Sequence, residues 1–90
     1  MDSKIKQTKT IPIGQNIRTI RQAKGIGQTE LVRLLQLQGI DMTRESLVKI
    51  ERGIQHIYAT QLQGIRNVLE TTYDELLKES ENTLYKDENK

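Results

Sequence analysis

The chain has 90 residues, of which 34% are hydrophobic and 29% charged, and its formal net charge is +2. This length suits one small domain, and because Phe and Trp are absent the core must be built from Ile, Leu and Val, which favours several short helices over a β-sandwich. Cysteine is absent, histidine occurs once and no apolar run approaches the ~18 residues of a membrane span, so we expect a cytoplasmic protein without disulfides, metal or cofactor.

Charge is distributed unevenly along the chain. Residues 1–60 hold ten Lys and Arg against five acids, whereas residues 61–90 hold four against seven, which gives +5 and −3. Such asymmetry is expected where one surface approaches a polyanion and the other faces away from it.

Residues 1–12 are predicted to form a flexible basic arm. The opening MDSKIKQTKT has no hydrophobic periodicity and carries Lys4, Lys6 and Lys9, so we expect it to be disordered without a partner. Two interpretations fit this composition: a solubilising tail, and an arm that adds contacts to phosphate.

The first helix is predicted over residues 13–24. Pro12 lies near its start, where a missing amide costs nothing, and Gly25 lies just past its end. Its buried stripe consists of Ile13, Ile17 and Ile20. Arg21 lies at the edge of that stripe rather than opposite it, so this arginine needs a compensating partner.

The second helix is predicted over residues 28–38. Its apolar residues follow helical spacing and are Leu31, Val32, Leu34, Leu35 and Leu37. The helix is expected to end at Gly39, because glycine readily takes the left-handed conformation that closes a helix.

The third helix is predicted to run to about Arg52 and to stop at Gly53, with the Thr43 side chain accepting from its free amides. At 100° per residue one side carries Ser46, Leu47, Ile50 and Glu51. The other side carries Arg44, Glu45, Val48, Lys49 and Arg52. This outer set resembles the groups that read base edges in a major groove, and a solvated charged face is the alternative.

Glu51 lies near the C-terminal end of this helix, where the macrodipole disfavours a carboxylate. Like Arg21, it therefore needs a compensating partner.

Beyond the third helix the chain is predicted to form a linker and two more helices. Ile57 is expected to fill the core, and His56 to be an exposed loop residue, with contact to a phosphate as its alternative role. The fourth helix is predicted over residues 60–70, where Gly64 permits close helix packing. The last helix opens with a capping box from Thr72 to Glu75 and turns three residues inward: Tyr73, Leu76 and Leu77. The domain then spans residues 13–79, and residues 80–90 are a polar tail.

Residues 13–77 resemble the helix-turn-helix of the phage repressor and Cro family, often called the xenobiotic-response-element type. The strongest signs are Arg21, Gln28 at the start of the second helix, and the ending Ile50-Glu51-Arg52-Gly53. Two features depart from the common pattern. The second helix and turn are several residues longer than in compact members, and Val32 stands where a small alanine is usual.

The resemblance implies an all-α fold, a compact five-helix bundle of the lambda-repressor-like DNA-binding type with an extended second helix and turn. It also implies that Arg21 and Glu51 pair across the edge of the core. The residues expected to read bases in double-stranded DNA are Arg44, Glu45, Val48 and Lys49. The residues expected to contact phosphate are Gln28, Thr43 and Arg52.

The function that these observations favour is sequence-specific DNA binding by a transcriptional regulator, most simply a repressor associated with the nucleoid. Enzyme activity is not expected, because no nucleophile with a base, shielded carboxylate pair or phosphate loop can be assembled. The alternative is a protein-interaction module, such as an antitoxin or adaptor, that uses the same fold. For a homodimer, the predicted contact is the region from Val68 to Leu77, where any uncovered apolar residue needs burial.

Overall fold

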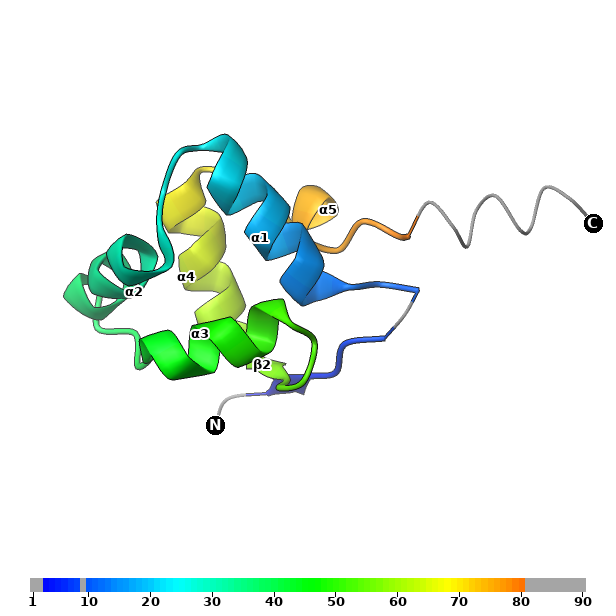
Figure 1. Cartoon of the computed structure of the whole chain (residues 1–90). Coiled ribbons are helices and arrows are strands. Elements are labelled where there is room, and N and C mark those ends of the chain that lie inside the picture. Colours follow the sequence, from blue (N-terminus) through cyan, green and yellow to red (C-terminus); the bar gives the residue numbers. More distant parts are fainter. Residues whose placement is uncertain (1–2, 9, 81–90) are drawn as a thin grey trace, which may run out of the picture.

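The computed structural model describes residues 3–8 and 10–80, and this part of the chain contains five helices and one two-stranded sheet (Figure 1). In chain order they are β1 (Lys4–Ile5), α1 (Ile13–Ala23), α2 (Gln28–Leu37), α3 (Arg44–Glu51), β2 (Ile57–Tyr58), α4 (Ala59–Leu69) and α5 (Tyr73–Leu76). The five-helix prediction is confirmed, and the small sheet is an addition to it. Of the predicted polar tail, all but Ser80 lies outside the described residues.

The core lies where α1, α2, α3 and α4 meet. Its fully or nearly fully buried side chains are Ile13, Ile17, Leu31, Val32, Leu35, Met42, Leu47, Ile50, Ile57, Leu62, Ile65, Leu69 and Leu76. Ile57 fills the core as predicted, with none of its surface exposed. A side chain added at Gly64 would overlap Ile40 and press on Leu35, so α4 packs closely on the end of α2 and the turn after it.

Two residues that were predicted to face inward are less buried than expected. Leu77 is 38% exposed, because α5 is only four residues long and Leu76 already occupies the inward position. Ile20 in α1 is only partly buried against the core. Neighbouring helical residues differ by 100° in direction, so only one of Leu76 and Leu77 can point at the core.

The expectation of a flexible arm is corrected by β1, which pairs antiparallel with β2. Lys4 lies opposite Tyr58, and Ile5 lies opposite Ile57. The Ala59 amide also donates to the Ser3 carbonyl at 2.7 Å. The physical reason is that the extended segment after α3 offers unpaired backbone groups, which the first residues of the chain satisfy. Ile5 turns toward the core, whereas Lys4 and Lys6 are exposed.

The backbones of α1 and α3 come into direct contact at Gly14. A Cβ at this position would overlap the Ile50 carbonyl group and crowd the Glu51 Cα. Gly14 is buried in the first turn of α1. The absence of a side chain at Gly14 therefore sets how closely the first and third helices approach.

Candidate nucleic-acid interface

Helix α3 has the two faces that its sequence predicted. Leu47 and Ile50 are completely buried. On the opposite face Arg44, Glu45 and Lys49 are exposed, as is Arg52 directly after the helix, and Val48 is half-buried. Thr43 caps the helix, because its Oγ1 accepts from the Ser46 amide at 3.0 Å. The predicted base-reading residues therefore share one accessible surface.

The charged side chains on this surface are available for an external partner. Arg44, Glu45 and Lys49 make no side-chain hydrogen bond or ion pair with any other residue that the structure describes. Guanidinium and ammonium groups donate, and a carboxylate accepts. The outer face of α3 thus presents both kinds of group that recognise base edges.

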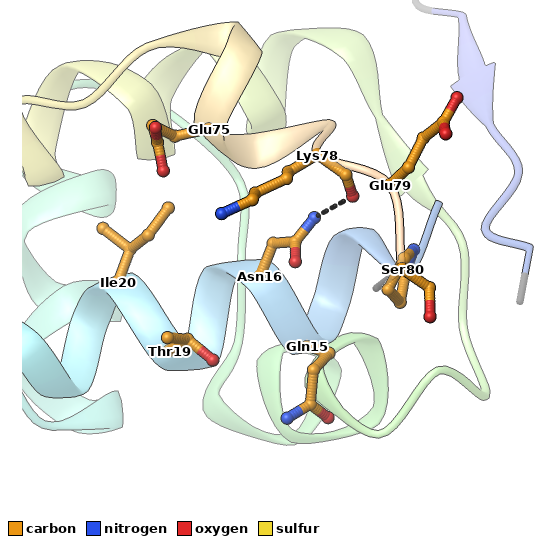
Figure 2. A pocket seen from close by; sticks show the side chains of 9 residues that line it. Gln15, Asn16, Thr19, Ile20, Glu75, Lys78, Glu79 and Ser80 are labelled. Atoms are coloured by element: carbon orange, nitrogen blue, oxygen red, sulfur yellow. Dashed lines mark hydrogen bonds between the residues drawn. The ribbon is translucent and has the colours of Figure 1, made fainter. Parts of the chain in front are cut away.

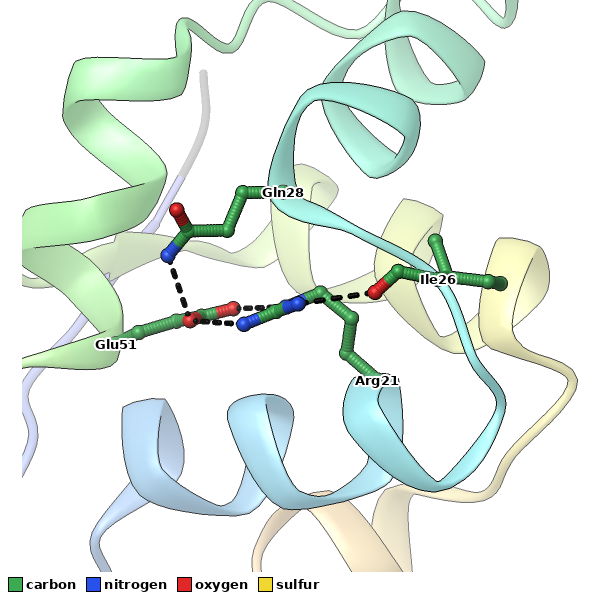
Figure 3. Close-up of polar contacts among 4 residues, drawn as sticks. All are labelled: Arg21, Ile26, Gln28 and Glu51. Atoms are coloured by element: carbon green, nitrogen blue, oxygen red, sulfur yellow. Dashed lines mark hydrogen bonds and ion pairs between the residues drawn. The ribbon is translucent and has the colours of Figure 1, made fainter.

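The C-terminal end of α3 is fixed by a buried polar node, in which Arg21 and Glu51 form a two-fold charge-assisted pair (Figure 3). Arg21 Nε lies 2.7 Å from Glu51 Oε2, and Arg21 Nη2 lies 2.9 Å from Glu51 Oε1. Arg21 Nη1 donates to the Ile26 carbonyl at 2.9 Å. The two side chains are only 8% and 2% exposed. This is the pair that the family resemblance implies.

Gln28 joins the same node, which changes the role expected of its side chain. Its Nε2 donates to Glu51 Oε1 at 3.0 Å (Figure 3), so one of its two amide hydrogens is used inside the protein. The cap position of α2 is Gly27, which supplies no side-chain acceptor to the first amides of the helix. The second amide hydrogen of Gln28 and these unpaired backbone amides therefore remain as donors.

A shallow hollow of about 330 Å³ opens beside this node. Its lining comes from α1, α2 and the end of α3 and consists of Arg18, Arg21, Gln22, Gln28, Val48, Glu51 and Arg52. Three arginines against one carboxylate give the lining a positive formal charge, which suits an anion. Two of the predicted phosphate-contacting residues, Gln28 and Arg52, meet here, whereas Thr43 lies at the other end of α3.

Sequence reasoning missed two residues of this hollow, Arg18 and Gln22. A signal was available, because Arg18 lies three residues before Arg21 and Gln22 lies four residues after Arg18, so both Arg21 and Gln22 neighbour Arg18 on the helix surface. These residues form a polar edge of α1 beside its buried stripe.

The turn that leads into α3 is held by two glutamines. Gln36 Nε2 donates to the Met42 carbonyl and Gln61 Nε2 donates to the Asp41 carbonyl, each at 2.9 Å. Gln61 Oε1 also accepts from the Tyr58 amide at 3.0 Å. The extended turn is therefore tied to both α2 and α4, which fixes where α3 begins.

His56 differs from the exposed loop residue that was expected. It is half-buried, and its Nδ1 accepts from the Gln7 amide at 3.3 Å. The arm covers one side of this loop and occupies that nitrogen. The described structure gives His56 an internal partner.

Another hollow, of about 560 Å³, lies between α1 and the segment that follows α5 (Figure 2). Asn16 at its base donates through Nδ2 to the carbonyls of Leu76 and Lys78, at 2.9 and 3.0 Å. These bonds satisfy carbonyl groups at the end of α5 and attach the following segment to α1. The hollow therefore belongs to the attachment of α5 to α1, and it lies apart from α3.

Within residues 3–8 and 10–80, no three His, Cys, Asp or Glu side chains are grouped to hold a metal ion. In the same part of the chain, none of the helices has the length and apolar character needed to cross a membrane.

Solved structures place this arrangement among known folds. The restriction-modification controller protein C.AhdI from Aeromonas hydrophila superimposes with a TM-score of 0.61 at 29% sequence identity, over 73% of this chain and 92% of that protein. The chain shares the helix-turn-helix fold of this controller protein. A mutant of the restriction-modification controller protein C.Esp1396I has the same fold, with a TM-score of 0.62 at 23% identity over 82% of this chain and 92% of that one.

Within this fold, α2 and α3 are the two helices of the helix-turn-helix, and α3 is the second. No protein-family model and no curated sequence matches the chain.

Proposed function

We propose that the chain is a sequence-specific regulator of transcription, most simply a repressor, which places α3 in the major groove of double-stranded DNA. The observation that carries this proposal is the accessible face of α3 next to the cationic hollow of Arg18, Gln28 and Arg52. One surface reads bases, and the adjoining surface attracts the phosphate backbone. A regulatory role also fits the two controller proteins that share this fold.

In this proposal the base contacts come from the outer face of α3. Arg44 and Lys49 donate to guanine, Glu45 accepts from the exocyclic amine of cytosine, and Val48 meets a thymine methyl. Phosphate contacts come from Gln28, Thr43 and Arg52. We add Arg18 to this set, because it lines the same hollow as Gln28 and Arg52.

Selection of preferred sites from random duplex DNA tests the proposal most directly. We expect one short site with at least one G·C pair per half, because the start of α3 carries Arg44 and Glu45. A pool that shows no enrichment over successive rounds would contradict sequence-specific binding. Enrichment of a palindrome would also give the spacing of two half-sites.

The competing function is a protein-interaction module that touches DNA weakly or not at all. The two functions differ in their response to salt. Binding that neutralises several phosphates weakens with a log-log slope of about −0.9 per contact, whereas a mainly apolar protein contact does not. A shallow slope for the selected duplex would favour the interaction module.

We also propose that the chain forms a homodimer through the region from Val68 to Leu77. Leu77 is 38% exposed, and Val68 and Tyr73 are only partly buried against the core. Sedimentation of the wild-type chain and of Leu77→Glu tests this contact, because a charge within it should shift the population toward monomer. Equal masses for the two proteins would place the contact elsewhere.

DNA is the partner in this proposal, so the protein would act in the cytoplasm at the nucleoid. Control of a restriction-modification system, the role named for both structural neighbours, is a narrower form of the same proposal.

A further inference from the structure

The arm contains a second polar node, centred on Gln7. The Gln7 Nε2 donates to the Ile50 carbonyl at 2.9 Å and to the Gln55 carbonyl at 3.0 Å. Its Oε1 accepts from the Gly14 amide at 2.7 Å. An amide side chain has two N–H donors and one carbonyl acceptor, so each of its polar groups is used by the backbone of a different segment.

The three backbone groups that Gln7 joins belong to places where helices begin or end. Gly14 lies in the first turn of α1, where amides have no acceptor within the helix. Ile50 is the penultimate residue of α3, and Gln55 lies in the loop after it. Gln7 therefore ties the start of α1, the end of α3 and the following loop together.

This node coincides with the closest approach of the two helices. The Gly14 backbone touches the Ile50 carbonyl, and a Cβ at Gly14 would overlap it. A change in the Gln7 contacts would therefore act directly on the packing of α3 against α1. Hydrogen-bond geometry tolerates only a few tenths of an ångström, so a small shift of α3 alters contacts made from its outer face.

The arm is held at its other end by the sheet. Ile5 pairs with Ile57, Lys4 pairs with Tyr58, and the Ala59 amide donates to Ser3. Residues 3–8 thus form a strap that runs from the segment after α3 to the start of α1. Since every polar group of the Gln7 side chain is occupied within the protein, Gln7 has no donor left for a nucleic acid.

We propose that this strap orients the reading helix and that Gln7 is a positioning residue for DNA binding, acting through α3 without touching DNA. This inference rests on the proposed function. It assigns a role in recognition to a segment that lies outside the helix-turn-helix.

The test compares Gln7→Ala with Gln63→Ala, a matched substitution at an exposed glutamine of α4. Two properties are measured well below the melting temperature of each protein: hydrogen exchange at the Gly14 amide, and affinity for the selected duplex across a salt series. Under these conditions both variants are folded, so a loss of stability alone leaves the affinity unchanged.

We expect Gln7→Ala to lose protection at the Gly14 amide and to bind the selected duplex about tenfold more weakly, with the wild-type salt slope. Gln63→Ala should match the wild type in protection, affinity and salt slope. A reduced salt slope for Gln7→Ala would show that the arm contacts phosphate directly, which overturns the positioning role. Lost protection with wild-type affinity would overturn it as well.

A second variant, Gln7→Glu, guards against a failure of Gln7→Ala to fold. It keeps an oxygen that accepts from Gly14 but replaces the donor to Ile50 and Gln55 with a second oxygen, so only the α3 side of the strap is released. We expect retained protection at Gly14 together with weakened binding, and wild-type binding would overturn the inference. If the wild-type chain itself selects no duplex, the proposed function fails. If the wild-type chain selects a duplex and the Gln7 variants bind it with wild-type affinity, only the role of the strap fails.

Discussion

The two ends of α3 are built in opposite ways. At its C-terminal end, buried and half-buried polar side chains from the arm, α1 and α2 converge on Ile50 and Glu51. At its N-terminal end, Arg44 and Glu45 are exposed and make no polar side-chain contact within the described structure. Gln7, Arg21 and Gln28 hold the C-terminal end of the helix, whereas Arg44 and Glu45 at the N-terminal end are available for recognition. This separation lets the reading residues change without disturbing the fold.

The largest loss of stability should come from removing the Glu51 carboxylate at the C-terminal end of α3. Glu51→Ala leaves Arg21 buried without its partner and removes the acceptor of Gln28, so we expect a loss of about 3 to 5 kcal/mol in the free energy of unfolding, measured with urea. A double-mutant cycle with Arg21→Ala checks the cause. A coupling energy near zero would contradict the pair as the source of the effect.

A smaller loss should follow from Gly14→Ala at the same end. The added methyl group would overlap the Ile50 carbonyl and push α1 away from α3, which we expect to cost about 1 to 3 kcal/mol in thermal or urea unfolding. Gly27→Ala is the matched control, because a Cβ at Gly27 would meet no atom within 4 Å. Equal losses in the two variants would argue against close helix contact as the cause.

Gln28→Ala tests a residue that lies between the buried C-terminal end of α3 and the surface proposed to bind DNA. It loses the bond to Glu51, which should cost about 1 kcal/mol in unfolding. Because a phosphate contact carries no base information, the substitution should also weaken binding to selected and scrambled duplexes by a similar factor. A change in which sequence is preferred would show instead that Gln28 reads bases.

Glu45→Ala should have the smallest effect on stability and a clear effect on recognition. A carboxylate in the first turn of a helix contributes only ~0.3 to 1 kcal/mol through the dipole. Its removal should strengthen binding to unrelated DNA, because repulsion by phosphates is lost, and should lower the ratio of specific to non-specific binding. Both affinities are measured at one salt concentration, alongside melting temperatures. An unchanged ratio would exclude a reading role for Glu45.

The sequence predicted the helices and the Arg21–Glu51 pair for a physical reason. Apolar periodicity reports burial directly, and a charged residue at the edge of an apolar stripe is costly to bury alone. Arg21 and Glu51 each departed from its local pattern, and the family resemblance joined them. The same reasoning found the cap at Thr43 and the close packing at Gly64.

The strap could not be predicted in this way. Gln7 is neutral, and its partners are backbone groups, which every residue possesses. Pairing of β1 with β2 joins segments more than fifty residues apart, and two-residue strands carry no periodicity. Arg18 and Gln22 were also missed, but they differ from Gln7 because their spacing from Arg21 can be read in the sequence.

The pairing of β1 with β2 also limits when the strap can take its final position during synthesis. The strap is translated before its partners, because the carbonyls that Gln7 engages belong to residues made 43 and 48 positions later. At about 5 to 20 residues per second, the ribosome needs roughly 2 to 10 seconds to supply them. Throughout that interval Ile5 has no partner strand, and Gln7 is not yet anchored as the acceptor for the Gly14 amide. The strap therefore reaches its final place only after the segment that follows α3 has been made.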